Sequence, residues 1–102
     1  MRILWTDPAV DDLQSIWDYI ARDSQVYATE FVGSIVSAVE RLEAFPGLGR
    51  QVPEANSRDI RELIFRNYRI MYRVHKDAVQ ILAVIHGSRD LTEGECKPWE
   101  VQ

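Results

Sequence analysis

Arginines and one histidine are the side chains in this sequence with the greatest capacity for chemistry. Arg69, Arg73 and Arg89 could supply positive charge, and His86 could act as an acid or a base. Cleavage of RNA without a metal requires such cations together with one acid and one base. The segment 91–95 is acidic, however, where RNA would need positive charge. The acidic segment therefore argues against RNA cleavage by these residues.

Each of these side chains also has a structural interpretation. His86 can cap a turn through the glycine that follows it. Arg89 can pair with the neighbouring aspartate, a contact that stabilises little when it is exposed. Arg69 and Arg73 can pair with Glu62 on the adjacent predicted strand. From these residues alone, both interpretations stay open.

Positive charge is concentrated in one segment of the chain. Residues 58–76 hold six basic and two acidic residues, a balance of +4, in a chain whose net charge is −4. The remaining residues therefore carry −8. This asymmetry indicates one basic surface on an otherwise acidic protein. Because nucleic-acid-binding domains usually carry an excess of positive charge, no direct and specific binding of nucleic acid is expected.

Patterns for metals, cofactors and membranes are missing from the sequence. His75 and His86 lie on different predicted strands without an evident third ligand, and Cys96 is the single cysteine. No glycine-rich phosphate loop joins a strand to a helix. No apolar run approaches the roughly 20 residues of a membrane span, and the N-terminus has no signal-peptide core. We expect no metal, no cofactor, no membrane association and a cytoplasmic location.

Hydrophobic periodicity predicts the elements that must position these residues. Residues 2–6 alternate as in a strand, and two helical patterns follow, the first capped by Asp7 and the second by Ser24. After a loop over residues 46–57, a period of two predicts three strands joined by two-residue turns. These strands are Ile60–Phe65, Tyr68–His75 and Ala78–His86.

The expected fold class is therefore α+β. An N-terminal strand leads into a helical hairpin, which is followed by a three-stranded antiparallel meander. Since each helix has one apolar face only, both helices should pack on one face of the sheet. Residues 1–90 should form a single domain, followed by a C-terminal tail over residues 91–102.

Two-residue turns would also fix which side chains share a face of the meander. One face is then almost wholly apolar and suits the helices, and it includes Ala83 and Ile85. The other face has an apolar centre flanked by arginines, with His86 at its end. Exposed apolar patches rimmed by polar groups often mark binding sites. We predict that this face binds an acidic and hydrophobic partner segment through Ile64, Arg69, Met71, Arg73, Leu82 and Val84.

Several motifs occur in a specific order along residues 5 to about 90. They are Trp5-x-x-x-Ala9-x-x-Asp12-Leu13, Gly49-Arg50, Tyr68-Arg69-Ile70-x-Tyr72 and His86-Gly87-x-Arg89-Asp90. In this order and spacing the chain resembles the ParE/RelE superfamily of bacterial toxins from type II toxin–antitoxin pairs, and within it the ParE branch. The resemblance implies a helical hairpin on an antiparallel sheet. It also implies an antitoxin partner whose segment wraps the toxin and silences it.

The resemblance leaves a choice of target. ParE-like members are associated with poisoning of DNA gyrase, whereas RelE-like members cut mRNA on the ribosome. RelE-like enzymes place a tyrosine in the C-terminal segment, and none follows Tyr72 here. We therefore expect a gyrase inhibitor without catalytic residues, in which His86 and Arg89 contact the target. The alternatives are a ribosome-dependent mRNA endonuclease and a non-toxic interaction module of the same fold.

One further expectation concerns the tail. Because the fold and the antitoxin site are expected to depend on earlier residues, truncation after Asp90 should abolish toxicity while leaving the fold and much of the antitoxin affinity intact.

Overall fold

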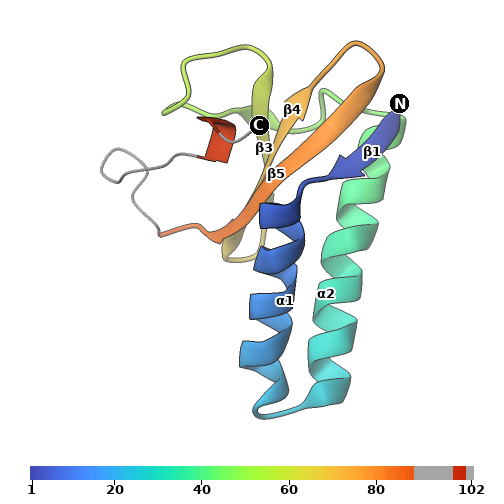
Figure 1. Ribbon diagram of the computed structural model, residues 1–102, viewed down its shortest axis with the longest axis vertical. Helices are drawn as coiled ribbons and strands as arrows, with labels where there is room; N and C mark the ends of the chain where they lie inside the picture. The colour runs from blue at the N-terminus through green and yellow to red at the C-terminus, as the bar shows by residue number, and fades with distance from the viewer. Residues whose placement is uncertain (89–97, 101–102) are drawn as a thin grey trace.

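The computed structural model describes residues 1–88 and 98–100 and has the predicted α+β fold (Figure 1). Two helices run side by side as a hairpin next to a single sheet with strand order β1-β5-β4-β3-β2. Among the described strands, only β1 and β5 pair in parallel. The elements are β1 (Arg2–Trp5), α1 (Asp7–Ala21), α2 (Gln25–Glu40), η1 (Arg41–Glu43), β2 (Arg50–Gln51), β3 (Ile60–Phe65), β4 (Tyr68–Val74), β5 (Ala78–His86) and η2 (Pro98–Glu100).

Side-chain caps start both helices. Ser24 caps α2 as predicted, because its hydroxyl accepts a hydrogen bond from the Tyr27 amide at 3.1 Å. The cap of α1 is Thr6 and not the predicted Asp7, and the Thr6 hydroxyl accepts from the Ala9 amide at 3.3 Å. The same hydroxyl donates to the Ile81 carbonyl at 2.7 Å, which ties the start of α1 to the sheet.

The main core lies between the helical hairpin and one face of the sheet. Phe31 of α2 contacts both Phe65 and Tyr68 edge-on, with ring centroids 5.8 Å apart in each pair. The residues that are buried in this cluster come from α1, α2, η1, β4 and β5. They are Ala9, Ile16, Phe31, Ile35, Val39, Leu42, Ile70, Tyr72, Val79, Ile81 and Val84.

The register between β4 and β5 follows the prediction only as far as the pair Tyr72–Ile81. A β-bulge then shifts β5 by one residue, so that Ile70 pairs with Val84. A shift of one residue moves every following side chain to the other face of the sheet. The predicted faces at the end of β5 are therefore wrong: Val84 packs beneath the helices, and Ile85 packs on the opposite face.

The opposite face of the sheet is covered by two segments of the chain itself. Val52, from the segment after β2, and Trp99 of η2 pack on its apolar centre, where Met71 is 0% and Leu82 is 1% exposed. The predicted exposure of Met71 and Leu82 is therefore wrong. A second, smaller core occupies this face, and we call it the second core: Val52, Ile60, Met71, Leu82, Ala83 and Ile85, with Ala55 and Trp99 packed against it.

Candidate functional site

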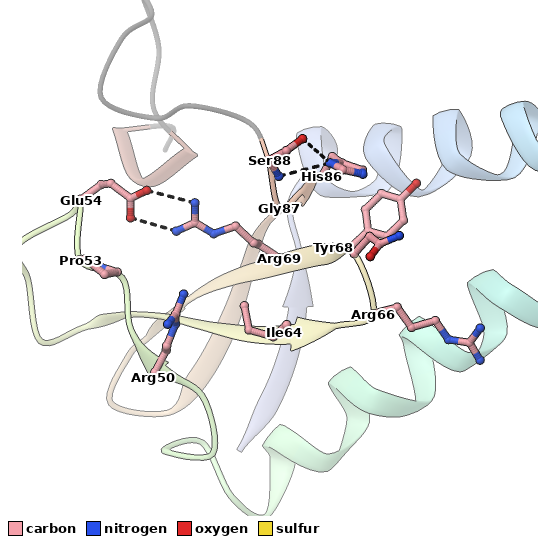
Figure 2. Close-up of a pocket in the computed structure, with 11 residues that line it drawn as sticks. Arg50, Pro53, Glu54, Ile64, Arg66, Tyr68, Arg69, His86, Gly87 and Ser88 are labelled. Atoms are coloured by element: carbon pink, nitrogen blue, oxygen red, sulfur yellow. Dashed lines mark hydrogen bonds and ion pairs between the residues drawn. The ribbon is translucent and has the colours of Figure 1, made fainter.

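A pocket of about 500 Å³ opens beside the second core, close to the turn between β3 and β4 and the end of β5 (Figure 2). We call it the Arg69 pocket. Its basic lining residues are Arg50, Arg66, Arg69 and His86, and its exposed apolar lining residue is Ile64. The pocket therefore combines positive charge with the exposed apolar side chain of Ile64, at the end of the sheet where β3 turns into β4.

Arg69 is held by two carboxylates. Its Nη1 and Nη2 donate to both oxygens of Glu54, at 3.0 and 2.9 Å (Figure 2), and its Nε donates to Glu62 at 2.6 Å. Glu62 accepts a second hydrogen bond from Arg50 Nε at 2.7 Å, and its side chain is completely buried. Bidentate pairs of this kind are strong and geometrically specific. Pairing of Arg69 with Glu62 is confirmed, and each of the three guanidinium nitrogens of Arg69 donates to a carboxylate oxygen.

Electrostatics stabilise the charged forms in this cluster. The hydrogen bond from Arg69 lowers the pKa of Glu54 below its ordinary value of 4.5, although burial opposes the shift. The Glu54 carboxylate in turn raises the pKa of Arg69, and Glu62 adds to this effect. The cluster is therefore a pre-formed ion network, with Arg69 at its centre.

The residues predicted to bind the antitoxin do not lie together on one surface. Ile64 is 56% exposed at the Arg69 pocket. Arg73 is half-buried and donates to the Trp99 carbonyl at 2.6 Å, and so it does not pair with Glu62. Met71 and Leu82 are buried in the second core, and Val84 lies on the helix side. Of the predicted apolar contact residues, Ile64 alone is exposed.

His86 lies on the helix side of the sheet, opposite to its predicted face. Beyond the bulge it pairs with Tyr68, and the two rings meet edge-on with centroids 5.6 Å apart. Its Nδ1 lies 2.6 Å from the Ser88 hydroxyl and accepts from the Ser88 amide at 3.2 Å (Figure 2). This geometry is the turn-capping arrangement that the sequence allowed. Arg89 lies outside the described residues.

Tyr72 fixes the segment that carries Arg50. Its hydroxyl donates to the Pro46 carbonyl at 2.9 Å and accepts from the Gly49 amide at 2.8 Å. Arg61 donates to the Gly49 carbonyl at 2.8 Å. Burial raises the pKa of Tyr72, so the hydroxyl stays protonated and keeps its donor role.

Sequence reasoning assigned no role to Glu54, Arg50 or Trp99, although Arg50 belongs to the Gly49-Arg50 motif. Glu54 and Arg50 lie in a segment that the composition assigned wholly to a loop, and no periodicity marked either side chain. Trp99 was the available signal, since a large aromatic residue in an otherwise polar tail tends to find an apolar surface. The described residues contain no cluster of three metal-ligating side chains and no helix long and apolar enough to cross a membrane.

Comparisons with known proteins agree with this fold. The family model described as the ParE toxin of the type II toxin–antitoxin system parDE matches residues 3–91. The protein Y4kP of Sinorhizobium fredii is 37% identical over 87 residues, which cover 83% of this chain and 86% of that protein. Toxin ParE3 of Caulobacter vibrioides is 28% identical over 91 residues, which cover 88% and 90% of the two chains.

A solved structure also matches. It is described as the chromosomal ParDE toxin–antitoxin system from P. aeruginosa, and it superposes with a TM-score of 0.72 at 27% identity. The match covers 84% of this chain and 95% of that one. Family model, relatives and structure point to the same branch, and the chain belongs to the ParE family of toxins from type II toxin–antitoxin systems.

Proposed function

We propose that this ParE-family toxin acts in the cytoplasm by binding DNA gyrase, and that a cognate antitoxin neutralises it by direct contact. The observation that carries the proposal is the family match over residues 3–91. A poison that binds a cleaved-DNA intermediate needs a contact surface, and it needs no general acid or base of its own.

The chemistry of the Arg69 pocket supports a binding role. Metal-independent RNA cleavage would need a cation free to stabilise the phosphorus centre and an acid or base within reach of it. Two carboxylates already neutralise Arg69, and the Nδ1 of His86 is engaged by Ser88. Within residues 1–88 and 98–100, these side chains are therefore positioned better for structure than for catalysis.

Induced expression in bacteria tests the proposal. With the chain alone, we expect arrested growth, an induced DNA-damage response, cleaved plasmid trapped with gyrase, and intact bulk mRNA. Co-expression of the protein encoded by the gene next to that of this chain should restore growth. Rapid cleavage of translated mRNA with normal supercoiling would instead place the activity in the RelE class, and normal growth would indicate a non-toxic interaction module.

His86 and Arg89 are the residues that we propose to contact the target. Replacing either by alanine should reduce toxicity and leave neutralisation by the antitoxin unchanged. His75→Ala is the matched control, because His75 is an exposed histidine in the turn between β4 and β5, where its ring lies 3.1 Å from the Gln80 side chain. Equal toxicity of the His86, Arg89 and His75 variants would contradict the proposed contact residues.

A further inference from the structure

The outer edge of β3 is paired along only part of its length. β2 pairs with Arg61 and Glu62, and the Val52 amide donates to the Ile60 carbonyl at 3.1 Å. Beyond Glu62, no strand among the described residues pairs with this edge. Within residues 1–88 and 98–100, the last three residues of β3 therefore have an open side.

Ile64 directs its backbone groups to that open side. In an antiparallel strand, the amide and carbonyl of one residue point the same way, and the direction alternates along the chain. Since the Ile60 carbonyl bonds to the β2 side, the Ile64 amide and carbonyl share that direction. Leu63 and Phe65 point instead toward β4, where they face Ile70 and Tyr68.

The Ile64 side chain is uncovered as well. Ile60 and Glu62, on the same face of the same strand, are each 1% exposed, whereas Ile64 is 56% exposed. The cover over this face of β3 thus ends at Glu62, three residues before the end of the strand. An apolar edge without lysine, proline or a bulge is a template for another strand. Ile64 therefore presents both an outward-facing backbone amide and carbonyl and an exposed apolar side chain.

Charge selects the kind of strand that fits. The Arg50 side chain, 63% exposed, lines the Arg69 pocket beside Ile64. Arg66 follows the open end of β3, and its guanidinium lies 5.5 and 5.6 Å from the ring centres of Phe31 and Phe65. Residues 58–76 carry +4 in total. In a dimer formed through this edge, the positive charges of one copy would face and repel those of the other. An acidic segment of another protein would instead be attracted.

We propose that an extended, acidic segment of the antitoxin adds as a strand to the edge of β3 at Ile64. Alternate side chains of that segment would enter the Arg69 pocket, and the others would lie beside Phe65 and Arg66. The inference depends on the proposed neutralisation by an antitoxin. It extends that proposal, because it specifies main-chain pairing at one residue and the charge of the partner segment.

The test replaces Ile64 by proline. Proline removes the outward amide, which the β3–β4 ladder does not use, and it is tolerated on edge strands for this reason. The probe is the purified protein encoded by the gene next to that of this chain, titrated by calorimetry. We expect Ile64→Pro to weaken binding about tenfold, which corresponds to the loss of one backbone hydrogen bond. Ile64→Thr, which keeps the amide and the β-branch, should bind within about threefold of wild type.

Hydrogen exchange on the wild-type complex supplies a readout that does not depend on a variant. The Ile64 amide should exchange quickly in the free chain and become protected in the complex. Wild-type affinity of Ile64→Pro, or an Ile64 amide that stays unprotected, would overturn the inference while leaving neutralisation intact. A dimer of the free chain that Ile64→Pro abolishes would assign the edge to a second copy instead. Absence of any wild-type complex would overturn both proposals.

Discussion

Glu62 has a completely buried carboxylate, and two arginines hold it from different sides. A buried charge is costly unless its partners are placed well, so Arg50 and Arg69 are needed for this position to be tolerated. Glu54 completes the cluster from the loop and binds the remaining nitrogens of Arg69. The network joins β2, β3, β4 and the segment after β2, and so it holds the wall of the Arg69 pocket in place.

Glu54 should make the stability of the fold depend on pH. Its folded-state pKa is lowered, so its contribution is fully present above the unfolded value of 4.5 and is lost as the pH falls through the lowered folded value. Glu54→Gln should reduce the free energy of unfolding by about 1 kcal/mol at pH 7, since the pair is partly exposed. Urea unfolding at pH 7 and at about pH 3 measures this difference, which should shrink at the lower pH.

Glu30→Gln, on the exposed surface of α2, is the matched control for this experiment. It should leave the free energy of unfolding within about 0.5 kcal/mol of wild type at both values of pH. A Glu54→Gln variant that loses stability equally at both would show that packing, and not the charge of Glu54, accounts for the effect.

β2 has only two residues and depends on its neighbours for its position. Gly49 precedes it and is buried between the Glu62 carbonyl and the Tyr72 hydroxyl. A Cβ atom at Gly49 would lie 2.6 Å from the Tyr72 oxygen and closer still to the Glu62 carbonyl. The requirement for glycine at this position is therefore steric, and it accounts physically for the Gly49-Arg50 motif.

Gly49→Ala should lower the free energy of unfolding by about 2 kcal/mol, because the added methyl group must displace backbone. It should also displace Arg50 from Glu62. Gly47→Ala is the control in the same loop: nothing lies within 4 Å of its Cβ position, so the change should be within about 0.5 kcal/mol. Thermal unfolding of both variants provides the comparison, and equal melting temperatures would contradict the steric account.

The sequence was sufficient to predict the elements whose hydrophobic pattern is regular. The two helices, the N-terminal strand and the order of the last three strands follow from periods of about four and of two. The β-bulge was not predictable, because nothing in a run of consecutive apolar residues specifies which one is extra. That single residue decides the face on which Val84 and His86 lie. At the bulged end of β5, Asp12 of α1 accepts from the Val84 amide at 2.9 Å, a long-range contact.

The candidate site was predicted less well than the fold. The face and its charge were selected from residues 58–76, and Ile64 and Arg69 do line the pocket. Their surroundings come from Arg50 and Glu54, which lie in an irregular segment without a periodic pattern. Chain segments that cover a sheet face are positioned by tertiary packing, which local sequence patterns do not encode.

The molecule has apolar contacts on both faces of its sheet, and the two faces are covered differently. Two long helices cover one face, whereas the covering segment after β2 and the single turn of η2 cover the other. A small domain has little stability to spare. Trp99 therefore matters to the whole fold, although it lies near the C-terminus.

Truncation after Asp90 should lower the stability of the fold, which corrects the expectation that the fold depends only on earlier residues. The truncation removes Trp99, which packs on the second core, and its carbonyl, which accepts from Arg73 at 2.6 Å.

Trp99→Ala alone should reduce the free energy of unfolding by about 2 kcal/mol, given partial burial of a large aromatic side chain. Trp99→Phe, which keeps much of the contact, should lose about half as much. Denaturant titration measures all three variants. A truncated chain as stable as wild type would show that Trp99 contributes nothing to the stability of the fold. Only in that case could a loss of toxicity on truncation be assigned directly to lost contacts with the target.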